Sequence, residues 1–344
     1  MMELGPRKQT LLQAIIEVYV RSAEPVGSEW LAANQKLGVR SATIRNEMAE
    51  LTELGLLRQP HTSAGRVPSD RGYRYYVDRL MHRRPLPAPH ARPLQELGRV
   101  CDGDVADLLR QTCRVLSSLT RYTSVASPPM TEHLRIRQVH LAKMSDRQLL
   151  VVVVLDNGCL IHRFAEPLQR LTAAEVERLS RGLDQLLGGA DANAVAAAPH
   201  RLPGELSGYR DTLLALLGVV ERSMGQEEGD LFLEGASRIL EQPEFRDAGK
   251  VEPLIRRLEA RKRAFETLQE LLAGEPWTVV IGSENPQREF QECSLVAARY
   301  DAGRGAAGWI GVLGPTRMPY GHTVPAVKMA ARTLTEAFAR IGLD

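Results

Sequence analysis

The residue types best suited to recognition chemistry gather in one run of this sequence, from Ser41 to Leu51. At about 100° per residue, an α-helix places three apolar side chains of the run on one face and three small or polar ones opposite: Ile44, Met48 and Leu51 against Ala42, Asn46 and Ala49. Small residues let a helix lie deep in a DNA groove, and Asn and Arg side chains can hydrogen-bond to base edges. The run therefore predicts a recognition helix, although an amphipathic core helix with a solvated face has the same pattern.

The acidic residues of this helix indicate which of its ends would meet DNA. Glu47, Glu50 and Glu53 all stand in its later half, where phosphates would repel them. The N-terminal half would then enter the groove, as in a helix-turn-helix, and its free N–H groups suit a phosphate. The predicted contacts come from four residues: Ser41, Thr43, Arg45 and Asn46.

A short β-hairpin is predicted directly after this helix. Residues 56–59 form its first strand, 63–65 its turn and 66–67 its second strand, which Pro68 ends. Three residues at or near the tip could meet DNA: His61, Thr62 and Arg66. Such a wing meets the DNA backbone or the minor groove, where arginine is favoured. An ordinary exposed hairpin is the alternative.

Basic and aromatic residues alternate just beyond the hairpin. Arg71 and Arg74 stand about one helical turn apart and could both hold phosphates, contacts that position a protein without reading sequence. Neither has an obvious acidic partner at helical spacing. Three tyrosines in this stretch are better explained by core and domain-junction packing than by base stacking: Tyr73, Tyr75 and Tyr76.

The elements that must position these residues are short helices. The first is predicted from Arg7 to Ser22 and is broken by residues 24–27. The second runs from Glu29 to about Lys36 with Ser28 as its N-cap, and a glycine then turns the chain into the recognition helix. Three helices followed by a β-hairpin make a winged helix-turn-helix.

No catalytic, metal or cofactor site is predicted. Residues 303–308 fit the Gly-x-Gly-x-x-Gly pattern, but a strand follows them and Lys328 stands where an acid would be expected, so a glycine-rich hairpin is the better interpretation. The four cysteines show no spacing that suits zinc. Glu284 and Asn285 could line a ligand cleft, although a structural turn is the simpler explanation. We expect a binding protein rather than an enzyme.

Composition agrees with a cytoplasmic regulator. The chain has 344 residues, 44% of them apolar and 25% charged, and a formal net charge of +2. Residues 1–84 hold 13 Lys and Arg against 9 Asp and Glu, whereas the remainder holds 31 against 33, so the positive end is the one assigned to DNA. The longest aliphatic run, 149–155, is far shorter than the roughly 20 residues that span a bilayer, and no membrane partner is expected.

The predicted fold class is α+β with several domains. The winged helix takes residues 1–84, and a Pro-rich linker, 85–93, is expected to be stiff and extended. Residues 94–132 and 206–344 contain a helix and a strand, then helical pieces, strands and a final helix. Residues 133–205 have a different sequence pattern, which predicts a three-stranded antiparallel meander and one helix. One α+β domain with an insertion would suit this order.

The inserted segment is expected to act in assembly. Its central strand, 149–155, is too uniformly aliphatic to have one side in water. A self-complementary contact there would give a two-fold dimer, which an inverted-repeat operator requires. The alternative is that the inserted segment makes no contact with a second chain.

Several motifs resemble those of the HrcA family of heat-inducible transcription repressors, bacterial regulators of chaperone genes. In the N-terminal part these are residues 24–28, 42–48 and 59–78. Further on they are 232–236, 242–245, 283–286, 292–296 and 310–318. The resemblance therefore spans nearly the whole chain.

The sequence departs from the family pattern at four positions. Glu29 replaces a residue that is usually basic, and Trp30 one that is small and polar, so a phosphate contact from the second helix cannot be carried over. Arg40 stands where the family commonly has Ser as helix cap, which leaves the cap between Arg40 and Ser41. Pro319 replaces a usual acid.

The resemblance implies a GAF-like α+β domain interrupted by an inserted dimerisation domain. It also implies a homodimer on an inverted-repeat DNA operator upstream of chaperone operons, release under heat stress, and a chaperonin that assists the folding of the repressor. A metabolite-sensing regulator, with a ligand in the GAF-like cleft, is the alternative.

Overall fold

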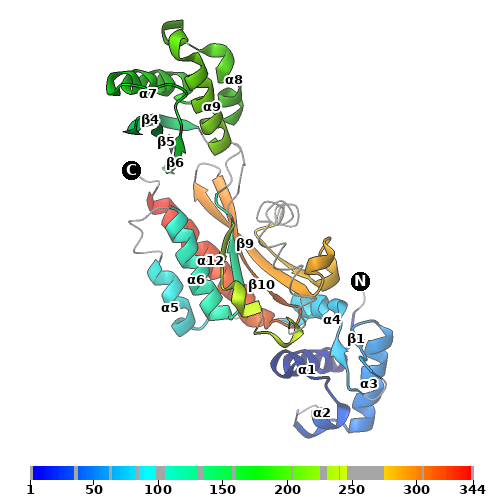
Figure 1. The fold of residues 1–344 in the computed structure, drawn as a ribbon. Coiled ribbons are helices and arrows are strands. Elements are labelled where there is room, and N and C mark those ends of the chain that lie inside the picture. The colour runs from blue at the N-terminus through cyan, green and yellow to red at the C-terminus, as the bar shows by residue number, and fades with distance from the viewer. Residues whose placement is uncertain are drawn as a thin grey trace.

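A computed structural model gives the fold of the chain (Figure 1). It describes residues 3–34, 38–61, 64–82, 85–97, 105–129, 135–156, 160–202, 204–224, 231–239, 241–245, 275–303 and 306–341. Three bodies follow one another in space, with the N-terminal helices at one end and an inserted helix-and-sheet domain at the other. Residues 254–272, which belong to the segment expected to contain helical pieces, lie outside the described residues.

The N-terminal body is a winged helix, as predicted. Helices α1 (Pro6–Ser22), α2 (Ser28–Asn34) and α3 (Ser41–Glu53) precede a small antiparallel sheet of β1 (Leu57–Arg58) and β2 (Val67–Pro68). The apolar stripes of the helices meet in one core, in which Leu12, Ile15, Leu31, Ile44 and Leu51 are fully buried. Pro68 belongs to the pairing rather than ending it, because it lies opposite Leu57.

Helix α4 (Asp70–Tyr75) and a π-helical turn (Tyr76–Leu80) lead out of the winged helix. The predicted stiff, extended linker is wrong, because residues 88–97 form helix α5 (Ala88–Leu97). Pro89 lies in the first turn, where the missing N–H has no partner to lose, whereas Pro93 lies inside the helix and removes one of its hydrogen bonds. Buried Ala91 and Leu94 anchor α5 in the core, so burial overrides the Pro-rich composition.

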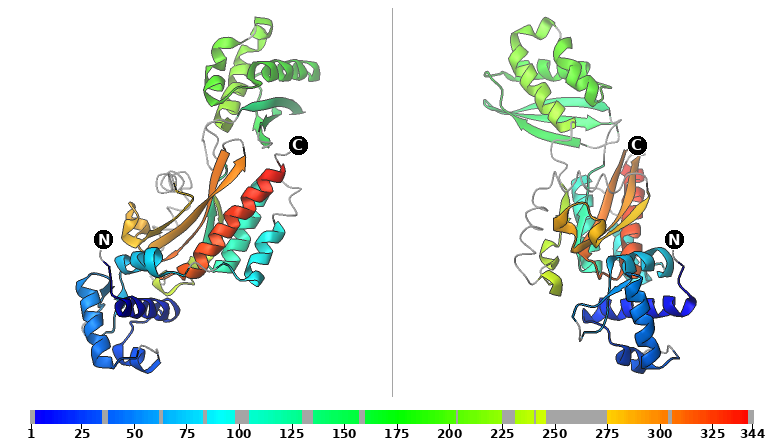
Figure 2. Two further views of the ribbon diagram at one scale, coloured as in Figure 1. Left: turned by 180° about the vertical axis from the view of Figure 1, so that it is seen from behind. Right: turned by 90° about the vertical axis from the view of Figure 1, so that its right-hand side faces the viewer.

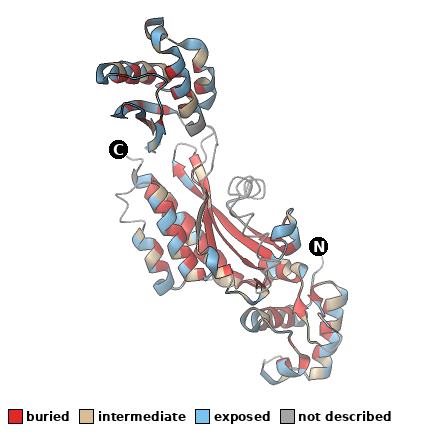
Figure 3. Cartoon of the chain, in the orientation of Figure 1, coloured by how far each residue is buried: buried red, intermediate tan, exposed pale blue. Residues whose placement is uncertain are grey.

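The central domain is an antiparallel sheet with helices on one face (Figure 2). The strand order is β7-β3-β10-β9-β8, from β3 (Thr123–Ala126), β7 (Phe232–Glu234), β8 (Trp277–Ile281), β9 (Cys293–Gly303) and β10 (Ala306–Pro315). Helices α5, α6 (Val105–Thr120) and α12 (Tyr320–Ile341) pack together beside it. Figure 3 shows this sheet as the most continuous buried element of the molecule. Sequence analysis missed β7, a three-residue strand.

Short 3₁₀ turns complete the described central and inserted parts: Ala198–Arg201, Gly204–Tyr209, Ala236–Ile239, Pro243–Phe245, Gly282–Glu284 and Arg288–Phe290. The sheet's other face carries a smaller core around Val125, Leu295 and Leu313, closed by Phe245 and Phe290.

The inserted domain contains the predicted meander, β4 (Ile136–Ser145), β5 (Gln148–Leu155) and β6 (Leu160–Ala165), in the order β4-β5-β6. Helices α7 (Ala173–Leu187) and α9 (Arg210–Met224) pack on this sheet, and α8 (Ala192–Ala197) packs on α9. The boundary predicted at residue 205 is therefore too early, because α9 belongs to the insert.

The meander has one covered and one open face. Along β5, Leu149, Val151, Val153 and Leu155 are buried, whereas the alternate residues are only half-buried. The open face adds exposed Leu160 and Phe164 on β6, which lie opposite half-buried residues of β5. Sequence analysis predicted that neither side of this strand would contact water. Within a single chain that prediction is wrong, because one side is only half-buried.

Candidate DNA-binding surface

Helix α3 presents its predicted polar face to solvent. Ile44, Met48 and Leu51 are buried against the other helices, whereas Arg45 and Asn46 are exposed. The helix is held by its apolar face, which leaves the side chains of Arg45 and Asn46 on the exposed face, where they can approach a base edge.

The start of α3 is open. Arg40 is the N-cap, in an extended backbone conformation and with no side-chain hydrogen bond to the helix. Half-buried Ser41 does not cap either; its hydroxyl donates to Oγ of Ser28 over 3.2 Å. Thr43, two positions further on, is also half-buried. Because no side chain caps the first N–H groups, they remain available to an anion such as a phosphate.

Basic residues at the start of α1 pair with two of the three acidic residues of α3. Arg7 pairs with Glu47, which is buried, and Lys8 pairs with Glu50. Sequence analysis placed these carboxylates away from DNA but did not predict their partners. The adjacent basic residues Arg7 and Lys8 were the signal that could have indicated these ion pairs.

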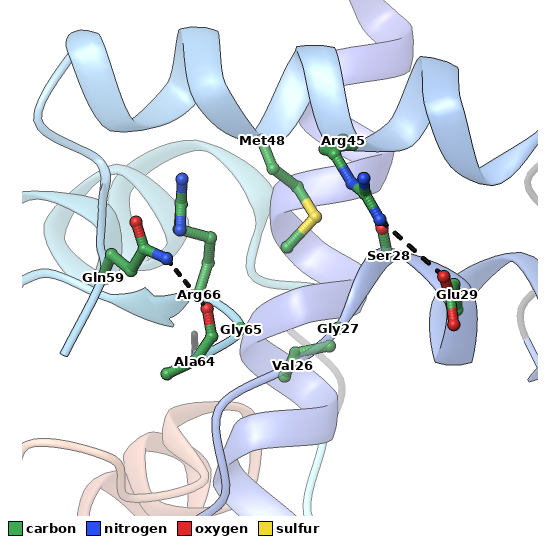
Figure 4. Close-up of a pocket in the computed structure, with 10 residues that line it drawn as sticks. All are labelled: Val26, Gly27, Ser28, Glu29, Arg45, Met48, Gln59, Ala64, Gly65 and Arg66. Atoms are coloured by element: carbon green, nitrogen blue, oxygen red, sulfur yellow. Dashed lines mark hydrogen bonds and ion pairs between the residues drawn. The ribbon is translucent and has the colours of Figure 1, made fainter. Parts of the chain in front are cut away.

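A groove of about 450 Å³ lies between α3, the start of α2 and the wing (Figure 4). Arg45 reaches into it from α3 and Arg66 from the wing, and Glu29 lies beside Arg45. The walls approach closely at Gly65, where a Cβ atom would lie 2.4 Å from the carbonyl oxygen of Val26. Only glycine fits there, so the groove depends on that residue.

The wing is stiffened by three hydrogen-bonded contacts. Val26 and Arg66 form an antiparallel bridge, with both N–H···O distances 2.9 Å. The guanidinium Nε of Arg66 donates to Oγ1 of Thr52 over 3.1 Å, and Gln59 Nε2 donates to the carbonyl of Ala64 over 3.1 Å. Arg66 therefore reaches the groove from a fixed base. Of the other two predicted tip residues, His61 is exposed and Thr62 lies outside the described residues.

The structure separates the two arginines that follow the wing. Arg71 is exposed, and its guanidinium lies over Gly55, whose φ is +73°. Arg74 is engaged by two acidic residues: it pairs with Asp78, one helical turn away, and with Glu284 of the central domain. The expectation that Arg74 has no acidic partner at helical spacing is wrong.

All three guanidinium nitrogens of Arg74 are in use. Nε donates to Glu284 Oε1 over 2.8 Å, Nη1 to Asp78 over 3.2 Å, and Nη2 to Glu284 and to the carbonyl of Val279. The hydrogen bond to Glu284 is the main cause that raises the pKa of Arg74. The structure thus brings Arg45 and Arg66 to one groove of the winged helix, while Arg74 faces the central domain.

The other residues that suggested chemistry have structural roles. Asn285 is buried and donates to the carbonyls of Gly282, Phe290 and Cys293, which confirms the structural turn. Gly303 and Ala306 pair at the end of the β9–β10 hairpin, as expected for the glycine-rich motif. Within the described part of the chain, no group of three or more potential metal ligands occurs and no helix is long and apolar enough to cross a membrane.

Comparisons with known proteins cover nearly the whole chain. The family profile "Winged helix-turn-helix transcription repressor, HrcA DNA-binding" matches residues 3–77, and the profile "HrcA protein C terminal domain" matches residues 106–324. The heat-inducible transcription repressor HrcA of Pelotomaculum thermopropionicum is 39% identical over 342 residues, covering 99% of this chain and 98% of that protein. The protein of the same name from Geobacter sulfurreducens is 33% identical and covers 97% and 98%.

A solved crystal structure of a hypothetical protein has the same fold. It is 23% identical, with a TM-score of 0.72 over 98% of this chain and 100% of that one. The likeness extends over all three bodies, so the order of winged helix, central domain and insert recurs in an experimental structure.

Proposed function

The chain belongs to the HrcA family of heat-inducible transcription repressors, and we propose that it binds, as a homodimer, an inverted-repeat operator upstream of chaperone operons and releases it under heat stress. The observation that carries the proposal is the side-by-side exposure of Arg45 and Asn46 on α3, next to the groove that Arg66 enters. The repressor would act in the cytoplasm, where the operator DNA is.

We assign base reading to the N-terminal half of α3. Arg45 suits guanine and Asn46 suits adenine, because their side chains offer the paired hydrogen bonds that these bases accept and donate in the major groove. Ser41 and Thr43 would hold the adjoining phosphate together with the uncapped N–H groups. The wing would place Arg66, His61 and Thr62 at the neighbouring backbone or minor groove.

Phosphate contact beside the wing is assigned to Arg71 rather than to Arg74. Arg71 is exposed, whereas the donors of Arg74 are held by Glu284, Asp78 and Val279. This assignment leaves Arg74 at the junction with the central domain.

A second copy of the chain is the partner proposed for the open face of the inserted sheet. Four apolar side chains of the insert are more than half exposed: Met144 (57%), Leu160 (55%), Phe164 (58%) and Leu168 (69%). A monomer rarely leaves such a group in water, and a two-fold contact would cover it on both copies. Before assembly, the same face would expose the kind of apolar surface that a chaperonin binds, which supports the proposed folding role of a chaperonin.

Footprinting tests the operator. Wild-type protein should protect an inverted repeat upstream of a chaperone operon and leave a scrambled repeat unprotected, and an Arg45→Ala/Asn46→Ala double variant should lose the protection. Protection of both sequences alike would contradict the proposal.

Light scattering tests the dimer. Phe164→Asp should convert the dimer to a monomer, because a carboxylate would be buried in the contact. Leu214→Asp is the matched control, since Leu214 is also partly exposed but lies on α9. A Phe164→Asp protein that keeps the dimer mass would move the interface elsewhere.

A further inference from the structure

Two histidines lie in the middle of the open face of the inserted sheet. Val152 of β5 lies opposite His140 of β4 on one side and opposite His162 of β6 on the other, so the three residues form one row across the meander. Both imidazoles are exposed in the single chain, and Val152 between them is half-buried. The centre of this face therefore carries two titratable groups.

The two rows on either side of the histidines are mainly apolar. Alternate residues of a strand share a face, so three side chains from each strand make up the open face: Gln138, His140 and Ala142, then Leu150, Val152 and Val154, then Leu160, His162 and Phe164. Six of these nine side chains are apolar, and none is Asp, Glu, Lys or Arg. A sheet face that stays in water is normally polar, so this composition fits a face that a partner covers.

The charged neighbours of the two histidines along the strands lie on the covered side of the sheet. Arg163 lies opposite Val151, which is buried. Lys143 lies opposite Leu149, which is also buried, and its amine pairs with Asp146. Neither cation therefore shares the face of the imidazoles.

The remaining charged groups lie on the covered side or at the margins of the sheet. Helices α7 and α9 pack on the covered side, where Asp184 of α7 accepts a hydrogen bond from the N–H of Val139. Arg137 stands at the register shift near the start of β4, and Glu166 follows the end of β6. Arginine keeps its charge and carboxylates are ionised between about pH 5.5 and 7.5. Histidines are thus the groups of the open face that gain protons in this range.

We propose that His140 and His162 make assembly of the repressor depend on pH. A second copy of the chain covers the open face when its histidines are neutral, and the two copies separate when the histidines gain protons. Operator binding weakens with the dimer, because each copy alone holds one half-site. The inference rests on the proposed function, since it requires a dimer contact at this face.

The direction and size of the effect follow from the chemistry of imidazole. Histidine is the side chain that ordinarily changes its charge between pH 5 and 8, and a charge buried in an apolar contact without a partner is costly. Below about pH 6.5, each imidazole that must stay neutral weakens association by about 10-fold per pH unit. A two-fold contact contains each residue twice, so one histidine position accounts for a weakening of about 100-fold at about pH 5.5.

The test measures the dimer dissociation constant of full-length protein by sedimentation equilibrium at pH 7.5 and pH 5.5, at one ionic strength. For wild-type protein, we expect the constant to rise by about 100-fold or more at the lower pH. His140→Gln/His162→Gln should reduce that change to less than about 10-fold, because glutamine gains no proton. His200→Gln is the matched control, because His200 is exposed in the same domain but lies on a 3₁₀ turn that packs on α7, α8 and α9.

A second variant tests the charged state directly. His140→Lys/His162→Lys carries the charge at both pH values, so it should be a monomer at pH 7.5 at a concentration where wild-type protein is a dimer. Both replaced side chains are exposed in the single chain, and circular dichroism should therefore show a folded monomer.

Three results would overturn the inference: an unchanged dissociation constant of wild-type protein at pH 5.5, a full pH effect in the glutamine variant, or a dimeric lysine variant. If the lysine variant does not fold, the glutamine variant decides the matter alone. Failure of the proposed function looks different: wild-type protein would then be a monomer at pH 7.5, or Phe164→Asp would keep the dimer mass.

Discussion

The carboxylate of Glu29 lies 3.7 Å from the guanidinium of Arg45. Both side chains are exposed, at 85% and 70%, and both line the groove between α2, α3 and the wing, Glu29 from α2 and Arg45 from α3 (Figure 4). An acidic residue is thus on the face that we assign to DNA. It competes with DNA for Arg45 and repels the phosphates.

Replacing Glu29 by Gln should strengthen binding to DNA of any sequence. An exposed ion pair contributes up to about 1 kcal/mol, so its loss should tighten non-specific binding by up to about 5-fold. The slope of log K against log salt should steepen by up to about 0.9 if Arg45 gains a phosphate. Glu53→Gln makes the same change of charge at the far end of α3. Equal effects of the two variants would show that only net charge matters.

Replacing Asn46 by Ala should weaken operator binding far more than binding to random DNA. A good two-point base contact contributes about 1–3 kcal/mol of discrimination, and Asn46 is exposed on the face of α3 away from the core. Titrations with operator and random duplexes at one salt concentration measure both losses. An equal loss on the two duplexes would remove Asn46 from base reading.

Replacing Arg66 or Arg71 by Gln should weaken binding to all sequences alike. Each lost phosphate contact should reduce the magnitude of the slope of log K against log salt by about 0.9. Arg332→Gln serves as the control, because Arg332 lies on α12. A slope that does not change for one of the two variants would mean that its arginine does not reach a phosphate.

The elements of the winged helix could be predicted because their signals are local. Ile44, Met48 and Leu51 recur at helical spacing within eight residues, and the same residues are buried in the structure. The capping box at the start of α7, made by Thr172 and Glu175, is a local signal of the same kind.

The junction between the winged helix and the central domain could not be predicted, because its contacts join residues far apart in the sequence. Arg74 pairs with Glu284, 210 residues away, and Arg317 donates a hydrogen bond to the carbonyl of Val20, 297 residues away. In a single sequence, Arg74 and Arg317 cannot be distinguished from charged residues on the surface. The Pro-rich composition of residues 85–93 predicted an extended linker, whereas the burial of Ala91 favours helix α5.

Two cysteine thiols should be unreactive in the native protein. Burial raises the pKa of Cys113 and of Cys293 to about 12 each. Only the thiolate reacts with iodoacetamide, and at pH 8 almost none would be present at either site. Peptide mapping after brief alkylation should find both residues unmodified in native protein and modified in urea. Rapid labelling of either one in the native state would contradict this.

Glu175 should stabilise the inserted domain in a way that depends on pH. Its carboxylate accepts hydrogen bonds from Tyr209 Oη over 2.6 Å and from the N–H and hydroxyl of Thr172 over 2.7 Å each. The bond from Tyr209 is the largest cause that lowers the pKa of Glu175, and the bonds from Thr172 lower it further, to about 2. The bonds favour the ionised form, so folding favours the loss of this proton.

The sign of the pH effect follows from that shift. A carboxyl group whose pKa is lower in the folded chain than the usual 4.5 contributes its full stabilisation above about pH 4.5 and loses it as the pH falls towards 2. Glu175→Gln should therefore unfold more easily than wild type at pH 7, and the difference should vanish near pH 2. Tyr209→Phe should shrink the pH dependence, because it removes the largest cause. Urea unfolding followed by circular dichroism at pH 7, 5, 3 and 2 measures this, with Glu177→Gln on the same helix as control. A difference between wild type and Glu175→Gln that stays constant over this range would mean that the Thr172 and Tyr209 contacts do not favour the ionised carboxylate.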